Sequence, residues 1–224
     1  MRVGTNPELE LGRFLTDVSP FPNIAPILGA IEYCEAGQDE PVTLVILQKF
    51  IENQGDLWTL ILQQLGRIVA APAATGQAVG VGVASAVESA AADFHLGRMA
   101  LLGRRVGEMH KALCATTGDA RFDPEPVSDR DLAAWKENVE REAHDTLRLV
   151  QEAMPGMPAA ARETVKPLLG RGERLVERIR GVSCDLAGLV KSRFHGDLHL
   201  GQVLASRDDF IIVDFQGELG RSLE

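Results

Sequence analysis

The sequence predicts an α+β fold, with short antiparallel strands toward both ends of the chain and helices between them. Two apolar runs rich in strand-forming residues, 24–33 and 42–50, flank a polar turn. From about residue 55 to residue 180 the apolar residues recur with helical spacing, and short strand-like runs return after residue 192.

The bulk composition is that of an ordinary globular protein. The chain has 224 residues, of which 45% are hydrophobic and 25% charged. Its net charge of -9 repels phosphate polymers and anionic lipid, so we expect neither a nucleic acid nor a membrane partner. Glycines and a proline interrupt the most apolar stretch, 68–92, too often for a membrane span. Three well-separated cysteines and no apolar leader indicate a cytoplasmic protein.

The first helix is predicted over residues 7–17. Asn6 can cap the free amides of its first turn, and Pro7 is tolerated at the first helical position. The strands 24–33 and 42–50 should then form an antiparallel pair. Two strands are not stable alone in water, so this region needs further strands or cover from helices.

The middle of the chain is predicted to be helical. Asp56 can cap a helix through residue 64, and a longer helix covers 87–113. The stretch between them, rich in alanine, glycine and valine, fits either a loop or a weak helix. Ser128 and Asp131 form a capping-box pattern for a helix that ends near residue 154.

A further helix is predicted over 159–180, forming a helical hairpin with the preceding one. The chain then returns to short strands at 192–195, 202–205 and 210–214, with residues 206–209 as the turn between the last two.

The residues with the clearest chemistry lie in the last two predicted strands and in the loop before them. Asp197 begins a loop, Gln202 follows five residues later, and Asp214 ends the next apolar strand. This order matches the kinase arrangement of a base followed by two metal ligands. Asp197 would orient an acceptor hydroxyl and take its proton, while Asp214 and Gln202 would supply the oxygens that Mg²⁺ prefers. The sequence therefore predicts ATP and Mg²⁺ as cofactors.

Two histidines accompany these residues. His195 precedes the predicted base by two residues, where its ring is better placed to pin the loop by hydrogen bonds than to donate protons. His199 fits the same role. Taken alone, His-Gly-Asp is more often an ordinary turn, and only the joint pattern with Gln202 and Asp214 favours a kinase site. Trp58 and Trp135 are read as partly buried helix anchors in preference to sugar contacts.

The motif His195-Gly-Asp-Leu-His-Leu-Gly-Gln202 resembles the loop of the aminoglycoside phosphotransferase and choline kinase superfamily, His-Gly-Asp-x-His-x-x-Asn. Within this superfamily the chain is most similar to bacterial maltokinases. The similarity extends to residues 6–15, 28–30, 53–58 and 102–110, and so to most of the chain.

The resemblance implies a protein-kinase-like fold: residues 1–54 as a remnant of the N-terminal lobe with its hinge, and 55–224 as part of a mostly helical C-terminal lobe with a catalytic β-hairpin. It implies transfer of the ATP γ-phosphate to the anomeric hydroxyl of maltose, with a trehalose synthase as a possible partner. Gln48 and Phe50 fall at the hinge that binds adenine. Glu10, or alternatively Glu8, falls on the helix whose glutamate pairs with a phosphate-gripping lysine.

The sequence departs from this superfamily in several places. The glycine-rich phosphate loop and the strand lysine should precede Asn6, and the later, sugar-binding helices are absent. Gln216 stands where the family usually has glutamate. We therefore expect a partial chain that is inactive, or nearly so, alone. Two alternatives stay open: another small-molecule kinase of the superfamily, acting on an aminoglycoside, choline or a different sugar, and a non-catalytic kinase-like module.

Overall fold

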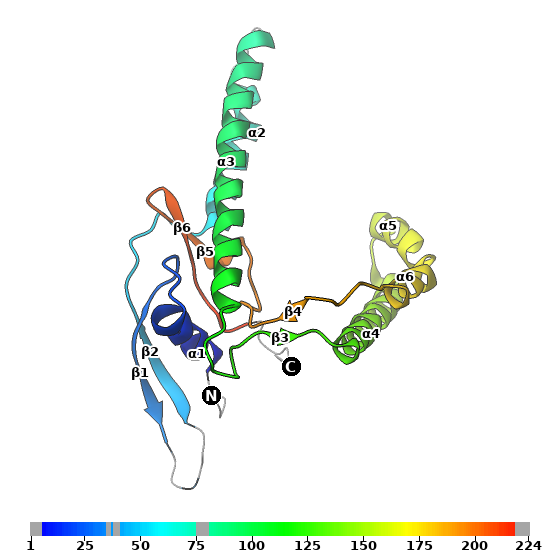
Figure 1. Ribbon diagram of the computed structural model, residues 1–224. Coiled ribbons are helices and arrows are strands. Elements are labelled where there is room, and N and C mark those ends of the chain that lie inside the picture. The colour runs from blue at the N-terminus through cyan, green and yellow to red at the C-terminus, as the bar shows by residue number, and fades with distance from the viewer. Residues whose placement is uncertain (1–5, 35–36, 38–40, 75–80, 218–224) are drawn as a thin grey trace. The chain divides into compact units, whose positions relative to one another are not determined.

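The computed structural model describes residues 6–34, 37, 41–74 and 81–217 (Figure 1). Within helices, the side chains of residues 68–95 are outside this description. The chain forms two compact units, the first made of residues 1–124 and 192–224 and the second of residues 125–191. The lobe boundary predicted at residue 54 falls inside the first unit and stays a prediction.

The first unit begins with the predicted helix. Helix α1 (Pro7–Arg13) continues into a π-helical turn, η1 (Phe14–Val18). The Asn6 side chain accepts hydrogen bonds from the backbone amides of Glu8 and Leu9, at 2.9 and 3.2 Å. The expected N-cap and the helix over 7–17 are therefore confirmed.

The predicted antiparallel pair is present, and it is shorter than predicted only at the ends away from the turn. Strand β1 (Ile27–Tyr33) pairs with β2 (Val42–Gln48). Helix α1 packs closely on β1, because a β-carbon added at Gly12 would lie 2.6 Å from Ile27 Cγ1. The β1–β2 pair has large exposed apolar side chains, namely Leu28, Ile31, Tyr33, Leu44, Val45 and Leu47.

The next two helices are longer than predicted. Helix α2 (Leu57–Ala74) begins after Asp56, whose carboxylate accepts from the Thr59 amide at 2.8 Å. Helix α3 (Val81–Leu113) begins six residues before its expected start at residue 87. Most of the stretch between the two predicted helices, which fitted either a loop or a weak helix, is thus helical. Residues 75–80 within it lie outside the described residues. Among the described residues, no helix combines the length and apolar character needed to cross a bilayer.

The predicted hairpin near the end of the chain is part of the first unit. Strand β5 (Val203–Ser206) pairs with β6 (Asp209–Ile212), and a short 3₁₀ turn, η3 (Leu200–Gln202), precedes them. Asp56 bridges to Leu204 on one side of the hairpin, and Ile24 bridges to Ile212 on the other. The hairpin thus joins the N-terminal segment to the helices.

Two apolar clusters hold the hairpin in place. One joins Ile212 and Phe215 to α1, η1 and the end of α3, and contains Leu11, Phe14, Leu15, Phe21, Ile24, Met109, Leu113 and Phe122. The other joins the hairpin to α2 and contains Leu57, Val203, Ala205 and Phe210. Burial of these side chains drives the packing of the segments that carry the site.

The hairpin turn is tied to α3 by an ion pair. The Arg105 guanidinium donates two hydrogen bonds to Asp209, from Nε at 2.8 Å and Nη2 at 2.7 Å. It also contacts Glu108 one turn along the helix. A bidentate pair of this kind fixes direction as well as distance.

We expect Arg105→Ala to lower the stability of the first unit by about 1 kcal/mol, because the Asp209 side chain is partly exposed and water screens the pair. Urea unfolding in a Trp135→Phe background measures this, since Trp58 is then the remaining tryptophan and lies in the first unit. Arg104→Ala, on the exposed neighbouring position, is the matched control and should change stability little. Equal losses in both variants would refute an anchoring role for Arg105.

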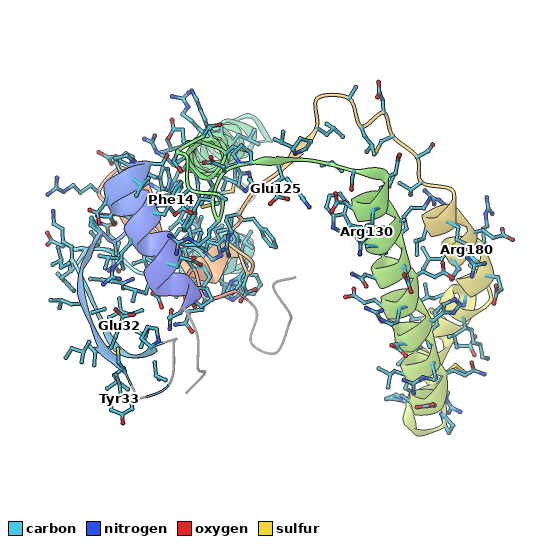
Figure 2. The ribbon with its side chains drawn as sticks, turned by 60° about the horizontal axis from the view of Figure 1, so that its bottom comes forward. Phe14, Glu32, Tyr33, Glu125, Arg130 and Arg180 are labelled. Atoms are coloured by element: carbon cyan, nitrogen blue, oxygen red, sulfur yellow. The ribbon has the colours of Figure 1, made fainter. Side chains whose placement is uncertain are left out.

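The second unit is a helical subdomain entered through a short strand pair. Strand β3 (Glu125–Pro126) pairs with β4 (Val190–Lys191). Helix α4 (Asp129–Ala153) has the predicted capping box, and a 3₁₀ turn, η2 (Met154–Gly156), follows it. Helices α5 (Ala159–Leu169) and α6 (Gly172–Arg180) complete the unit. Arg180 on α6, labelled in Figure 2, forms an ion pair with Glu140 on α4.

Two predictions in this region were wrong. The helix expected over 159–180 is divided in two, because the Gly170-Arg171-Gly172 segment favours helix ends and lets α6 pack closely on Leu147 of α4. The strand expected at 192–195 is absent, since pairing occurs at Val190–Lys191 instead. Residues 192–195 belong to no helix or strand and lead directly into the loop that carries Asp197.

Candidate active site

His195 joins the two loops that carry the predicted acidic residues. Its side chain is buried, with its ring 4.6 Å from that of Phe215. Nε2 lies 3.0 Å from the carbonyl oxygen of Val213, and Nδ1 lies 3.4 Å from the backbone amide of Asp197. A carbonyl only accepts, so Nε2 carries the proton and Nδ1 is the acceptor. The neutral ring therefore bridges the start of one acidic loop to the residue before Asp214.

Gly196 allows the sharp turn between His195 and Asp197. Its φ of 88° lies in the left-handed region, where a side chain would be strained. The turn brings the Asp197 amide back toward the imidazole. The His-Gly-Asp motif thus has a local geometric reason in addition to any chemical one.

Burial holds the pKa of His195 below its ordinary value of 6.5, although the hydrogen bond to Val213 and the charges of Asp214 and Asp197 act in the opposite direction. The unfolded chain then binds a proton at this position at a higher pH than the folded chain does. Stability should therefore fall as the pH drops below 6.5 and stop falling once the pH is below the lowered pKa of the folded state.

We expect His195→Gln to flatten this acid dependence, because glutamine can still donate to the Val213 carbonyl but does not titrate. Urea unfolding at several pH values, again followed by Trp58 fluorescence, measures the slope. His144→Gln removes an exposed imidazole from the second unit and serves as the control. A slope that persists in His195→Gln would contradict the assignment.

Gln202 and Asp214, the two predicted metal ligands, are in direct contact. Gln202 Nε2 donates to Asp214 Oδ2 at 2.7 Å, and the Val213 amide donates to the Gln202 carbonyl oxygen at 3.0 Å. Asp214 has a φ of 66°, a conformation that aspartate tolerates better than most residues but that still carries strain. Two side chains separated by a complete hairpin thus meet at one point.

The donor atoms at this point suit a hard divalent cation. The Gln202–Asp214 contact uses an amide N–H, so the amide oxygen and the second carboxylate oxygen are left as ligands. In the part of the chain that the structure describes, no three His, Cys, Asp or Glu side chains converge as a metal site. The protein would therefore contribute few ligands, as is usual where Mg²⁺ also binds phosphate oxygens and water.

Asp197 and His199 lie at the rim of the same loop. The Asp197 side chain is 43% exposed, and its Oδ2 is 3.9 Å from His199 Nε2. His199 Nδ1 accepts from the Gly201 amide at 3.0 Å and so caps the η3 turn. An accessible carboxylate is what a base for an incoming hydroxyl requires.

The two glutamates considered for nucleotide binding take different partners. Glu10 lies beside Arg193, with Oε2 3.3 Å from Nη2. Glu8 accepts from Gln48 Nε2 at 2.9 Å and from Gln216 Nε2 at 2.7 Å. Its pairing places Glu8 near the Asp214 loop, while the role predicted for Glu10 stays a prediction.

The predicted hinge residues lie at the end of β2. Gln48 is the last residue of that strand and, with Glu8 and Asp214, lines one small cavity. Phe50 follows the strand with its side chain 85% exposed. The structure thus brings Gln48 toward the Asp214 loop and leaves the Phe50 side chain at the surface.

A larger, mostly apolar cavity of about 620 Å³ lies beside the loop that follows Asp197. It is lined by Trp58 from α2, by side chains of α3 and by residues 198–201 and 203. Trp58 is 56% exposed and Trp135 is 46% exposed, so each is about half buried, in agreement with the partly buried positions expected for them.

Sequence reasoning missed Arg193 and the role of Gln216. Arg193 contacts Glu10 across 183 positions of the chain, and nothing in the local sequence indicates that partner. Gln216 was recognisable only as a departure from the family pattern. Its amide contact with Glu8 spans 208 positions.

The fold matches part of a kinase-like fold. The structure superposes on solved glucosamine kinases, one in crystal form B with a TM-score of 0.63 at 23% identity. Another, a complex with glucosamine, ADP and inorganic phosphate, matches with a TM-score of 0.64 at 22% identity. Each match covers 98% of this chain and 44% of the solved chain. The predicted α+β class is thus confirmed, and its match to part of a kinase-like fold is established.

The chain is distantly homologous to glucosamine kinase. It is 26% identical over 180 residues to the glucosamine kinase of Mycolicibacterium smegmatis (strain ATCC 700084 / mc(2)155), which covers 80% of this chain and 36% of that protein. It is 30% identical over 118 residues to the glucosamine kinase of Streptacidiphilus jiangxiensis, covering 53% and 23%. The chain therefore spans well under half the length of these relatives. No protein-family model matches it.

Proposed function

We propose that this chain carries the cation-binding and proton-accepting part of an ATP-dependent kinase that phosphorylates a sugar hydroxyl. The observation that supports it most is the junction of the two acidic loops: Gln202 contacts Asp214, and His195 bridges the Asp197 amide to Val213. Phosphoryl transfer needs positioned charges more than covalent chemistry from the protein. The homology to glucosamine kinase supports the same reaction class.

In the proposed reaction, Asp197 accepts the proton of the acceptor hydroxyl, whose oxygen forms a bond to the γ-phosphorus of ATP. The bond from that phosphorus to the β,γ-bridging oxygen breaks, and ADP leaves. Asp214 and Gln202 would hold Mg²⁺, which neutralises phosphate charge when bound. His195 keeps the two loops together, and the backbone at Gln48 and Phe50 would contact adenine. Glu10 is retained as a proposed nucleotide-site residue.

Two sugars are the leading candidates for the phosphate acceptor. The matching relatives are glucosamine kinases, which favours glucosamine. The loop from His195 to Gln202 resembles that of maltokinases, which favours maltose and a link to trehalose and α-glucan metabolism. In lobe terms, we propose residues 1–54 as part of an N-terminal lobe and 55–224 as part of a C-terminal lobe.

The test is a phosphorylation panel with Mg²⁺-ATP and glucosamine, maltose, an aminoglycoside or choline. It is run on the 224-residue chain, which we expect to be nearly inactive alone, and on the longest natural protein containing it. Sugar-dependent ADP release supports the proposal. Transfer only to an aminoglycoside or to choline overturns the sugar assignment. Absence of Mg²⁺-dependent ATP binding in both proteins overturns the kinase assignment and favours a non-catalytic module.

A further inference from the structure

Helix α1 directs two carboxylates to the two acidic loops. Positions 8 and 10 differ by about 200° around a helix, so their side chains leave on nearly opposite faces. The Glu10 carboxylate contacts Arg193 at 3.3 Å, two residues before His195. The Glu8 carboxylate accepts from Gln216 at 2.7 Å, two residues after Asp214. A single rigid element thus contacts the flank of each loop.

Arg193 is held from three directions. Besides Glu10, its Nε donates to the carbonyl oxygen of Arg121 at 3.1 Å, and its guanidinium carbon lies 5.5 Å from the centre of the Phe122 ring. Phe122 in turn stacks on Phe14 with ring centres 4.1 Å apart. The Glu10 side chain is only 13% exposed, so the pair is shielded from water better than a surface ion pair. The backbone leading into His195 and Asp197 is therefore fixed to α1.

Gln216 makes the second contact possible. A glutamate at this position would place two carboxylates against each other, whereas the glutamine amide donates to Glu8. The second oxygen of Glu8 accepts from Gln48 at the end of β2. Glu8, Gln48 and Asp214 line the same small cavity. The departure from the family pattern at 216 thus has a structural consequence at the proposed cation site.

We propose that α1 is the positioning element of the site, with Glu10 holding the Asp197 loop through Arg193 and Glu8 holding the Asp214 loop through Gln216. The functional meaning of this inference rests on the proposed function, but the contacts themselves can be tested without turnover. Each glutamate is the matched control for the other, since both are in the same helix and each serves a different loop.

Hydrogen exchange followed by mass spectrometry compares Glu8→Ala with Glu10→Ala in the 224-residue chain. Glu10→Ala should raise amide exchange in 193–199 by about tenfold and leave 213–217 nearly unchanged. Glu8→Ala should do the reverse. Exchange that rises equally in both segments for both variants, or in neither, overturns the proposal, because a general loss of stability would not separate the loops.

Swapping the hydrogen-bond donor and acceptor between positions 8 and 216 tests the Glu8 contact specifically. Gln216→Glu alone should raise exchange in 213–217, while the double variant Glu8→Gln with Gln216→Glu should restore it, since the amide and carboxylate have only changed places. Failure of the double variant to restore protection overturns this half of the proposal. If Glu10→Ala does not fold, Arg193→Lys, which keeps the charge but not the forked geometry, tests the other half through 193–199.

Binding of Mn²⁺ in the presence of ATP, followed by electron paramagnetic resonance, connects the contacts to the site. Glu8→Ala should weaken Mn²⁺ binding by about tenfold, as is typical for residues that orient a metal ligand, whereas Asp208→Asn, which removes an exposed carboxylate from the β5–β6 turn, should not. If the unmodified chain binds no Mn²⁺-ATP, the proposed cation site fails, while the exchange data still decide whether α1 positions the loops.

Discussion

Replacing Asp197 by asparagine is expected to lower turnover by about 10²- to 10⁴-fold, the range that a general base contributes. Asparagine has nearly the same shape but cannot take the proton of the acceptor hydroxyl. The Asp197 backbone amide, which contacts His195, is unaffected by the substitution. The measurement is sugar-dependent ADP release at saturating ATP and Mg²⁺, in whichever form of the protein turns over.

Nucleotide and metal affinities show whether Asp197→Asn has lost only the base or has also damaged the site. Nucleotide and Mn²⁺ affinities of Asp197→Asn should stay within about twofold of the unmodified protein, because the base contacts the acceptor and not the cation. Asp208→Asn removes an exposed carboxylate from the β5–β6 turn and should change neither quantity. Parallel losses of affinity and turnover in Asp197→Asn would instead identify Asp197 as a metal ligand.

The features that the sequence predicted well are those encoded by neighbouring residues. The Asn6 cap and the Ser128–Asp131 capping box depend on side chains that reach amides two or three positions away, and both were confirmed. The β5–β6 hairpin likewise follows from a short turn between two apolar runs. Local chemistry determines such elements before any tertiary contact forms.

Tertiary packing accounts for the features that the sequence did not predict. A helical pattern through 159–180 conceals the break at Gly170, because the break is stabilised by the approach of Gly172 to Leu147 on another helix. The strand at Val190–Lys191 depends on pairing with Glu125–Pro126, more than 60 positions earlier. Neither partner can be read from the local pattern.

The candidate site also combines features that the local sequence predicts with features that depend on tertiary contacts. The residue types at 197, 202 and 214 indicate the chemistry, because carboxylate and amide oxygens at this spacing are useful to a phosphotransferase. The spacing does not indicate which helix holds the loops. The family resemblance favours Glu10 over Glu8 for the nucleotide site, but it does not indicate that the two contact different residues, Arg193 and Gln216.

Asp214→Asn is expected to weaken Mg²⁺-dependent ATP binding by more than about 100-fold. Losing a residue that merely orients a metal ligand costs about 10- to 100-fold in affinity, and Asp214 would be a ligand itself. Asparagine also adopts the left-handed conformation found at φ 66°, and its oxygen can still accept from Gln202, so the fold should persist. Titration of ATP by calorimetry, with and without Mg²⁺, measures the change.

The metal-free titration makes this result specific. Loss of a cation ligand should remove the Mg²⁺-dependent part of the affinity and leave metal-free ADP binding within about twofold, since the proposed adenine contacts are made by the backbone at Gln48 and Phe50 and not by the Asp214 carboxylate. Gln202→Ala, which removes the neutral partner, should weaken Mg²⁺-ATP binding less than Asp214→Asn does, because the carboxylate supplies the charge. If Gln202→Ala proves the more damaging substitution, the cation is held elsewhere and the carboxylate of Asp214 serves mainly to orient the loop.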